Sequence, residues 1–185
     1  MAGNRNHYEK AFSGWLAASG VQAMGVDERA RPRLADRELK NFDFLVNGPD
    51  AVYALDLKGR RGTPWITQDD LFSLMAWRRV GAGALTPALV FAFYCTGPDL
   101  PSRLRQLPAL RLDLATGTYL FSCLGLADTQ RLARPRSRRW HTYGFEWAAF
   151  CKAVQPIDQI LLGAADTPAS KLHTGFELAT APAWR

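Results

Sequence analysis

The sequence has few of the side chains that bind zinc or act as activated nucleophiles. Three cysteines and three histidines are spread over 185 residues, and none has the short spacing of a zinc site. The cysteines are odd in number and each lies in an apolar stretch, which indicates reduced core residues rather than a disulfide framework. The sequence therefore supports neither a zinc cluster nor a Ser-His-Asp site.

Long apolar runs are also missing. No stretch approaches the roughly 18 uninterrupted apolar residues of a membrane span, and the first residues lack the apolar core of a signal peptide. We therefore expect a cytoplasmic protein that does not use a membrane. The chain length and the 48% hydrophobic content suffice for one globular domain, which we expect over residues 1–164, with an irregular tail over residues 165–185.

Acidic side chains are absent from the most basic part of the chain. The net charge is +6 at neutral pH, which favours polyanionic partners. One basic cluster follows Lys58 and a larger one occupies residues 131–139. Solvated surface charge and phosphate contacts that hold nucleic acid without reading its sequence are both open interpretations. The candidate phosphate-binding residues are Arg60, Arg61, Arg134, Arg136, Arg138 and Arg139.

Two aromatic residues adjoin the larger cluster. Trp140 and Tyr143 carry flat rings on which unpaired bases can stack. Packing beneath the arginine stems is the alternative, and for Trp140 we favour it.

Two apolar runs separated by a Gly-Pro turn predict an antiparallel hairpin. The runs cover residues 41–46 and 51–58. Because side chains of a strand alternate between its faces, Asp56 and Lys58 should share one face, and we expect Asp43 to lie opposite them. Two carboxylates and an ammonium on one face can hold a divalent cation and support hydrolysis.

Helical periodicity is clearest near the N-terminus. Apolar residues recur at three- and four-residue spacing, which predicts an amphipathic helix over residues 6–19 with Glu9 at the edge of its apolar stripe. A second helix should begin after Thr67, as N-cap, and end at Gly81. Later elements are a buried strand, a second strand, a helix and a short final element, expected over residues 88–94, 118–123, 145–154 and 157–162.

The hairpin resembles a known nuclease motif. The spacing of Asp43 and Asp56-x-Lys58 is similar to that of the PD-(D/E)xK nuclease superfamily. The run His-Tyr-Glu-Lys-Ala-Phe at residues 7–12 resembles the opening signature of the HYExAFE proteins, a bacterial family, and residues 136–142 resemble it too. Ser13 departs from that signature, in which an acidic residue is expected.

The resemblance implies a fold and a metal site. The fold is an α/β restriction-endonuclease-like αβββαβ core, with a mixed central sheet flanked by helices. Mg²⁺ or Mn²⁺ would be held by oxygen ligands. Lys58 would orient or help deprotonate the attacking water and stabilise charge on the scissile phosphate. Gln68 would lie near the metal, although a polar residue in a first helical turn is the other interpretation. The implied metal ligands are Glu9, Asp43, Asp56 and the carbonyl of Leu57.

The expected function is metal-dependent hydrolysis of phosphodiester bonds, in DNA rather than RNA, and a homodimer is compatible with it. A catalytically silent nucleic-acid-binding or scaffold protein that keeps the fold is the main alternative. A hydrolase of small phosphorylated substrates is a third interpretation. For the hairpin alone, Asp56 and Lys58 can instead form a surface ion pair of little energetic value.

Overall fold

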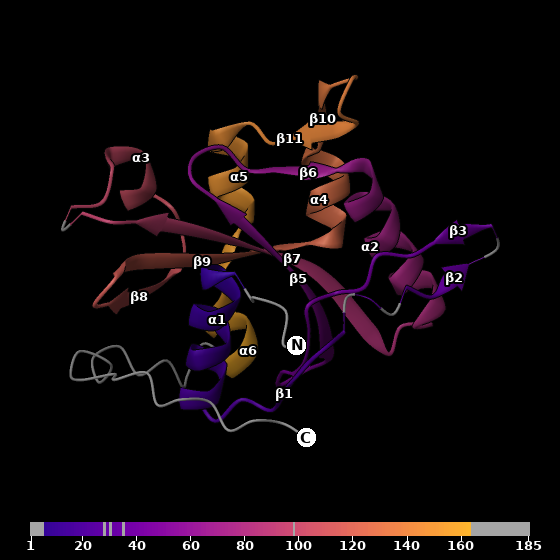
Figure 1. Ribbon diagram of the computed structural model, residues 1–185, viewed down its shortest axis with the longest axis horizontal. Helices are drawn as coiled ribbons and strands as arrows, with labels where there is room; N and C mark the ends of the chain where they lie inside the picture. Colours follow the sequence, from indigo (N-terminus) through magenta and orange to yellow (C-terminus); the bar gives the residue numbers. More distant parts are fainter. Residues whose placement is uncertain (1–5, 28, 30, 35, 98, 164–185) are drawn as a thin grey trace.

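The computed structural model describes residues 6–27, 29, 31–34, 36–97 and 99–163. A mixed sheet forms the centre, with strands in the order β1-β4-β5-β7-β9-β12 and β8 paired to β9 (Figure 1). Only β5 and β7 pair in parallel among these neighbours. The strands are β1 (Ala23–Gly25), β4 (Phe44–Asn47), β5 (Val52–Arg60), β7 (Leu85–Cys95), β8 (Leu110–Leu114), β9 (Gly117–Gly125) and β12 (Gln155–Pro156).

Helices cover both faces of this sheet. The first and last pack into one core, whereas the other four pack into a second core on the opposite face (Figure 1). The helices are α1 (His7–Ala18), α2 (Gln68–Val80), α3 (Ser102–Arg105), α4 (Leu126–Leu132), α5 (Trp147–Ala153) and α6 (Ile157–Leu162).

Two small sheets are added to this framework. One is a hairpin between β1 and β4, and the other joins a strand before α2 to a hairpin before α5. The strands are β2 (Arg33–Leu34), β3 (Arg37–Glu38), β6 (Trp65–Thr67), β10 (Arg134–Ser137) and β11 (Thr142–Gly144).

The element order confirms the expected fold class. Without the small sheets, the chain begins with α1, β1, β4, β5, α2 and β7, which is the αβββαβ order. The sheet is mixed and flanked by helices, as expected. The expected tail, residues 165–185, lies outside the described residues.

The two expected N-terminal helices form where their sequence signals lie. In α1 the buried residues include Phe12, Trp15 and Leu16, the predicted apolar stripe. In α2 the Thr67 side chain and Asp70 form a reciprocal capping box, and the helix ends before Gly81. Within the described part of the chain, no helix is long and apolar enough to cross a membrane.

A glycine allows α1 to pack against the centre of the sheet. A Cβ on Gly59 of β5 would collide with the ring of Tyr8, so the close approach requires glycine. The Tyr8 hydroxyl also donates a hydrogen bond to the carbonyl of Arg60, at 3.5 Å. The first turn of α1 is thereby fixed beside the residue that follows Lys58.

Candidate functional site

Asp56 and Lys58 leave the same face of β5, as strand alternation predicts. Both residues are 5% exposed, whereas Leu55 and Leu57 enter the core under α1. The Lys58 Nζ lies 2.6 Å from Asp56 Oδ2. The pair is therefore buried beneath α2, and the interpretation as a solvent-exposed surface ion pair is wrong.

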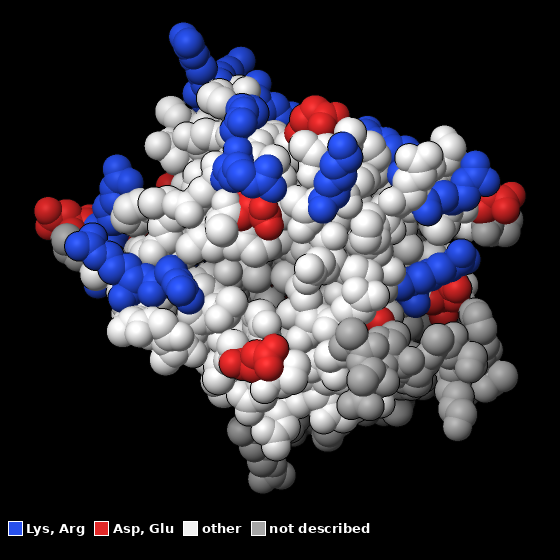
Figure 2. Space-filling model, turned by 180° about the vertical axis from the view of Figure 1, so that it is seen from behind, with Lys and Arg blue, Asp and Glu red and all other residues white. Residues whose placement is uncertain are grey.

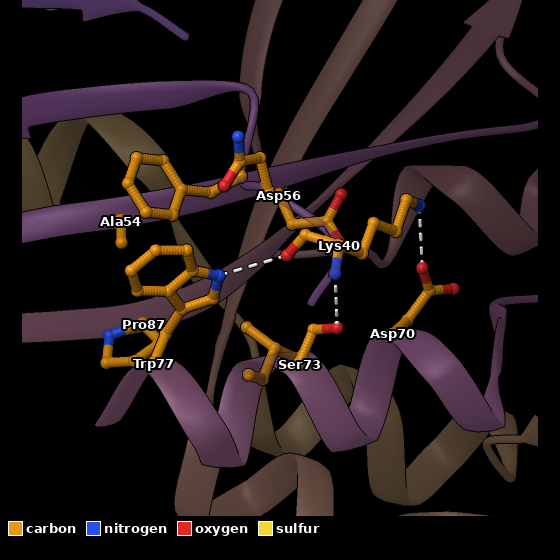
Figure 3. Close-up of a pocket in the computed structure, with 10 residues that line it drawn as sticks. Lys40, Ala54, Asp56, Asp70, Ser73, Trp77 and Pro87 are labelled. Atoms are coloured by element: carbon orange, nitrogen blue, oxygen red, sulfur yellow. Dashed lines mark hydrogen bonds and ion pairs between the residues drawn. The ribbon is translucent and has the colours of Figure 1, made fainter. Parts of the chain in front are cut away.

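Two further side chains complete a buried ionic network. Lys58 Nζ lies 2.8 Å from Asp70 Oδ1. Lys40 Nζ lies 2.7 Å from the same oxygen (Figure 3). Two carboxylates and two ammoniums cancel in formal charge, which offsets the cost of removing them from water. We define the network as Lys40, Asp56, Lys58 and Asp70.

Helix α2 fixes the orientation of Asp70. Asp70 Oδ2 accepts a hydrogen bond from the Thr67 N–H at 2.8 Å, while the Asp70 N–H donates to Thr67 Oγ1 at 3.1 Å. One oxygen of the Asp70 carboxylate thus completes the capping box, and the other binds the ammonium groups of both lysines.

The same helix holds the backbone of Lys40. The Lys40 N–H donates to Ser73 Oγ at 2.9 Å, and the Trp77 indole N–H donates to the Lys40 carbonyl at 2.9 Å (Figure 3). The Lys40 side chain is 35% exposed, so it joins the buried network to the surface.

The environment shifts the pKa values of Asp56 and Asp70 in opposite directions. Burial raises the pKa of Asp56, and this effect outweighs the neighbouring ammoniums of Lys58 and Lys40. Burial also opposes ionisation of Asp70, but Lys58 and Lys40 outweigh it and hold the pKa of Asp70 well below its usual range. Asp70 therefore keeps its charge at lower pH than an ordinary aspartate, whereas Asp56 accepts a proton more readily.

A small pocket adjoins the network. Asp56, Asp70 and Lys40 line it, together with apolar walls from Phe42 and Trp77 (Figure 3). It has room for about one water molecule. A water placed there would lie among the charged groups of both β5 and α2.

Asp43 directly precedes β4, the strand next to β5. Its N–H donates to the Leu55 carbonyl at 2.9 Å, and its Oδ2 accepts a hydrogen bond from the Leu57 N–H. Since Phe44, the first residue of β4, pairs with Leu55, Asp43 is the preceding residue and lies toward Asp56. The hairpin therefore brings Asp43 beside the backbone of the Asp56-x-Lys58 triplet.

Glu9 approaches from the other face of the sheet. It lies in the first turn of α1, where Oε1 accepts a hydrogen bond from Asn6 Nδ2 at 2.8 Å. Among the described residues, no group of three or more His, Cys, Asp or Glu side chains could hold a metal ion. The structure thus does not gather Glu9, Asp43 and Asp56 into one ligand set, and their role as metal ligands stays a prediction.

Gln68 begins α2 and is exposed, and its N–H donates to the His141 carbonyl at 2.8 Å. The α2 residue that reaches Lys58 is instead Asp70, two positions further along the helix. Asp70 and Lys40 were not predicted as site residues. The capping signal at Thr67 places an acidic Asp70 at the third helical position, but only packing of α2 against the sheet brings it to Lys58.

The basic residues have several different environments. Arg60 donates to the carbonyls of Trp65 and Gly59, and its guanidinium lies 4.0 Å from the Trp65 ring centroid. Arg134 donates to two carbonyls at the end of α4. Arg61, Arg136, Arg138 and Arg139 are exposed. Figure 2 shows Lys and Arg side chains gathered over the upper part of the molecule, the end at which Figure 1 shows β10.

Comparisons with solved structures give similarity at the level of the fold. No protein-family model and no curated protein match the chain. The chain is similar to Hjc, a Holliday junction resolvase from the archaeal hyperthermophile Archaeoglobus fulgidus, with 13% identity and a TM-score of 0.46 over 82% of this chain and 95% of that chain. Similarity of this degree does not establish a shared activity, and the HYExAFE resemblance stays a prediction.

Proposed function

We propose that the chain is a nuclease that hydrolyses phosphodiester bonds in DNA in a Mg²⁺- or Mn²⁺-dependent reaction. The supporting observation is the hairpin itself: Asp56 and Lys58 share one face of β5, and Asp43 bonds to the amide between them. This is the relationship that the PD-(D/E)xK resemblance implies. The exposed arginines at the upper end of the molecule suit a polyanionic substrate.

The two lysines supply positive charge for the reacting phosphate. Lys58 is held in place by two carboxylates, and Lys40 reaches from the network to the surface. Negative charge that develops on the phosphate oxygens would be stabilised by these ammoniums, most strongly where water is excluded. Lys58 is the catalytic cation in this scheme, and Asp70 is a positioning residue that holds it.

Asp56 lines the pocket that has room for about one water, and it is the carboxylate best suited to take a proton from an attacking water placed there. Burial raises its pKa above that of an ordinary aspartate, which moves its basicity toward neutral pH. Asp70 cannot share this role. Burial acts to raise its pKa, but the ammoniums of Lys58 and Lys40 outweigh that effect and hold the pKa low. A pair of carboxyls with opposed shifts is the usual sign of such a division of roles.

The donor types suit Mg²⁺, but their arrangement does not. Carboxylate and carbonyl oxygens are hard ligands of the kind that the ion prefers, and the bound ion would supply a Lewis acid for the phosphate. However, the Asp56 carboxylate already forms an ion pair with Lys58, and the Asp70 carboxylate forms ion pairs with both Lys58 and Lys40. The adjoining pocket has room for about one water. A cation could bind Asp56 only after Lys58 leaves that carboxylate, so the proposed metal dependence rests on the PD-(D/E)xK resemblance alone.

The same network favours a second candidate function. A buried, self-neutralised set of two lysines and two aspartates is a stable structural unit that needs no cation. A nucleic-acid-binding protein that keeps the nuclease fold without catalysis would carry such a unit. The two candidates differ in cleavage but agree in binding.

The test is cleavage of labelled linear duplex, single-stranded and branched DNAs, and of matched RNAs, with Mg²⁺, with Mn²⁺ or with EDTA. The native chain is compared with Asp56→Asn and Lys58→Met, and with the exposed controls Asp69→Asn and Lys10→Met. We expect metal-dependent cleavage that both site variants lose by at least about 100-fold and both controls keep. Light scattering on the same samples reports whether the active species is a homodimer.

Other results separate the two functions. If the native chain binds nucleic acid but cleaves none of the substrates, the non-catalytic function is correct. If cleavage persists in Asp56→Asn and Lys58→Met, another site performs it. The negative charge of Asp70 contributes to the raised pKa of Asp56. In Asp70→Asn, the pH at which the cleavage rate falls to half on acidification should therefore be lower, and this shift would support a positioning role for Asp70.

A further inference from the structure

The tip of the β10–β11 hairpin presents an exposed tryptophan. Trp140 is 68% exposed, the highest value among the exposed large hydrophobic residues of the described chain. Arg139 lies over its ring, 5.0 Å from the centroid. The expected packing of an arginine over Trp140 is therefore present, but most of the tryptophan side chain still faces solvent.

Two hydrogen bonds and a positive φ define the turn at this tip. His141 adopts a positive φ of 45°. The Trp140 N–H donates to Ser137 Oγ at 3.3 Å, and the His141 N–H donates to the Arg138 carbonyl at 3.4 Å. A large apolar ring kept exposed on an ordered turn is suited to a partner that supplies the missing contact.

The surroundings of Trp140 specify a polyanion. Residues 129–145 contain no acidic side chain. Arg138 and Arg139 are exposed at the tip, and Arg136 is exposed on β10. A partner with apolar flat faces and regularly spaced negative charges fits such a surface, which is the chemistry of an unpaired nucleic-acid strand.

A second arginine–tryptophan contact extends this surface toward the site. The Trp65 ring has the guanidinium of Arg60 at 4.0 Å and that of Arg136 at 5.5 Å from its centroid. Arg60 ends the strand that carries Lys58, and Trp65 is on β6. We call the set Arg60, Trp65, Arg136, Arg139 and Trp140 the arginine–tryptophan strip.

The strip ends beside the first turn of α2. Strand β11 pairs with β6 through Thr142 and Thr67, and the Gln68 N–H donates to the His141 carbonyl. Asp70, which binds Lys58, lies in that same helical turn. A strand lying along the strip would therefore pass close to the network.

We propose that Trp140 stacks on an unpaired base, while Arg136, Arg138 and Arg139 hold the phosphates beside it. This inference rests on the proposed nuclease function and narrows its substrate to nucleic acid with a single-stranded or unpaired segment next to the scissile bond. Stacking is tolerant of sequence because every base has a flat face. Fully paired duplex offers no such face along its length.

The test measures binding of a labelled single-stranded oligonucleotide and of the blunt duplex of the same sequence. The variants are Trp140→Ala, Trp140→Phe and the control Met75→Ala, which truncates an exposed apolar residue of α2. We expect Trp140→Ala to weaken single-strand binding about 10-fold or more, and duplex binding by less than about twofold. Trp140→Phe should keep most of the single-strand affinity, and Met75→Ala all of it.

Equal single-strand binding by Trp140→Ala and the native chain would overturn the proposal, because the Trp140 ring would then contribute nothing to the binding of unpaired bases. Equal loss on both probes would also overturn it, because the ring would then not distinguish unpaired bases. Failure of this proposal alone leaves metal-dependent cleavage of DNA by the native chain intact. If the native chain neither binds nor cleaves nucleic acid, the proposed function fails together with this inference.

Discussion

Asp70 in the first turn of α2 binds the ammonium of Lys58 on β5 at 2.8 Å. This contact joins the helix to the strand that carries the Asp56-x-Lys58 triplet, and Lys40 binds the same oxygen. The carboxylate therefore serves three purposes at once, as a helix cap, a partner of two ammoniums and a neighbour of Asp56. Its removal should affect stability and chemistry separately.

Replacement of Asp70 by asparagine should strongly destabilise the fold. Two ammoniums lose a buried anionic partner and the capping box loses its carboxylate, so we expect a loss of about 3–5 kcal/mol in the free energy of unfolding. Asp69→Asn, in the same turn but exposed, should change it by less than about 0.5 kcal/mol. Urea titration of both variants makes the comparison. Similar midpoints for Asp70→Asn and the native chain would show that the contact has little value.

The stability difference between the native chain and Asp70→Asn should depend on pH. Burial acts to raise the folded-state pKa of Asp70, but Lys58 and Lys40 outweigh it and hold this pKa below the ordinary value. A depressed carboxyl pKa stabilises the fold above the unfolded-state value of about 4, and the contribution is lost as pH falls below it. Urea titrations between about pH 7 and pH 3 should therefore show a shrinking difference on acidification. A difference that stays constant would contradict the assignment of Asp70 as the ionised partner.

The relative positions of Asp43, Asp56 and Lys58 could be predicted from local sequence patterns. Strand alternation gives the common face of Asp56 and Lys58, and the turn between the runs gives the hairpin that brings Asp43 alongside. The partners Lys40 and Asp70 could not be predicted in this way. They come from a loop and a helix that meet only when α2 packs on the sheet, and no periodicity reports that contact.

The second half of the chain shows the same limit. The short element at Ile157–Leu162 was expected and forms α6. The basic run at residues 131–139 was recognised by charge alone, and its structure as part of a β10–β11 hairpin was missed. Short strands with exposed arginines and a proline lack apolar alternation, so their pairing to β6 depends on tertiary context.

Gly59 offers a test of how α1 is seated on β5. A methyl group on Gly59 meets the Tyr8 ring, so Gly59→Ala should destabilise the fold by about 1–3 kcal/mol. Gly14→Ala is the matched control, because Gly14 is helical with nothing within 4 Å of an added Cβ, and it should stabilise by about 0.5–1 kcal/mol. Thermal denaturation measures both. Destabilisation of equal size in the two variants would contradict the close approach of Tyr8.

The cysteines should differ in reactivity. Cys123 is buried, and burial raises the pKa of its thiol to about 12, whereas Cys95 and Cys151 are only partly buried. Reaction with a disulfide reagent at about pH 8 should modify Cys95 and Cys151 first and spare Cys123 until the chain unfolds. Peptide mapping by mass spectrometry identifies the modified positions. Rapid modification of Cys123 in the folded chain would contradict its position in the core.

The most direct test of the central claim is the rate of metal-dependent DNA cleavage by Asp56→Asn relative to Asp69→Asn. The substitutions are chemically identical, but one removes the buried carboxylate beside Lys58 and the other an exposed carboxylate on α2. We predict that Asp69→Asn cleaves at the native rate and that folded Asp56→Asn loses cleavage by at least about 100-fold. Native-rate cleavage by Asp56→Asn would contradict the claim that the β5 site performs the hydrolysis.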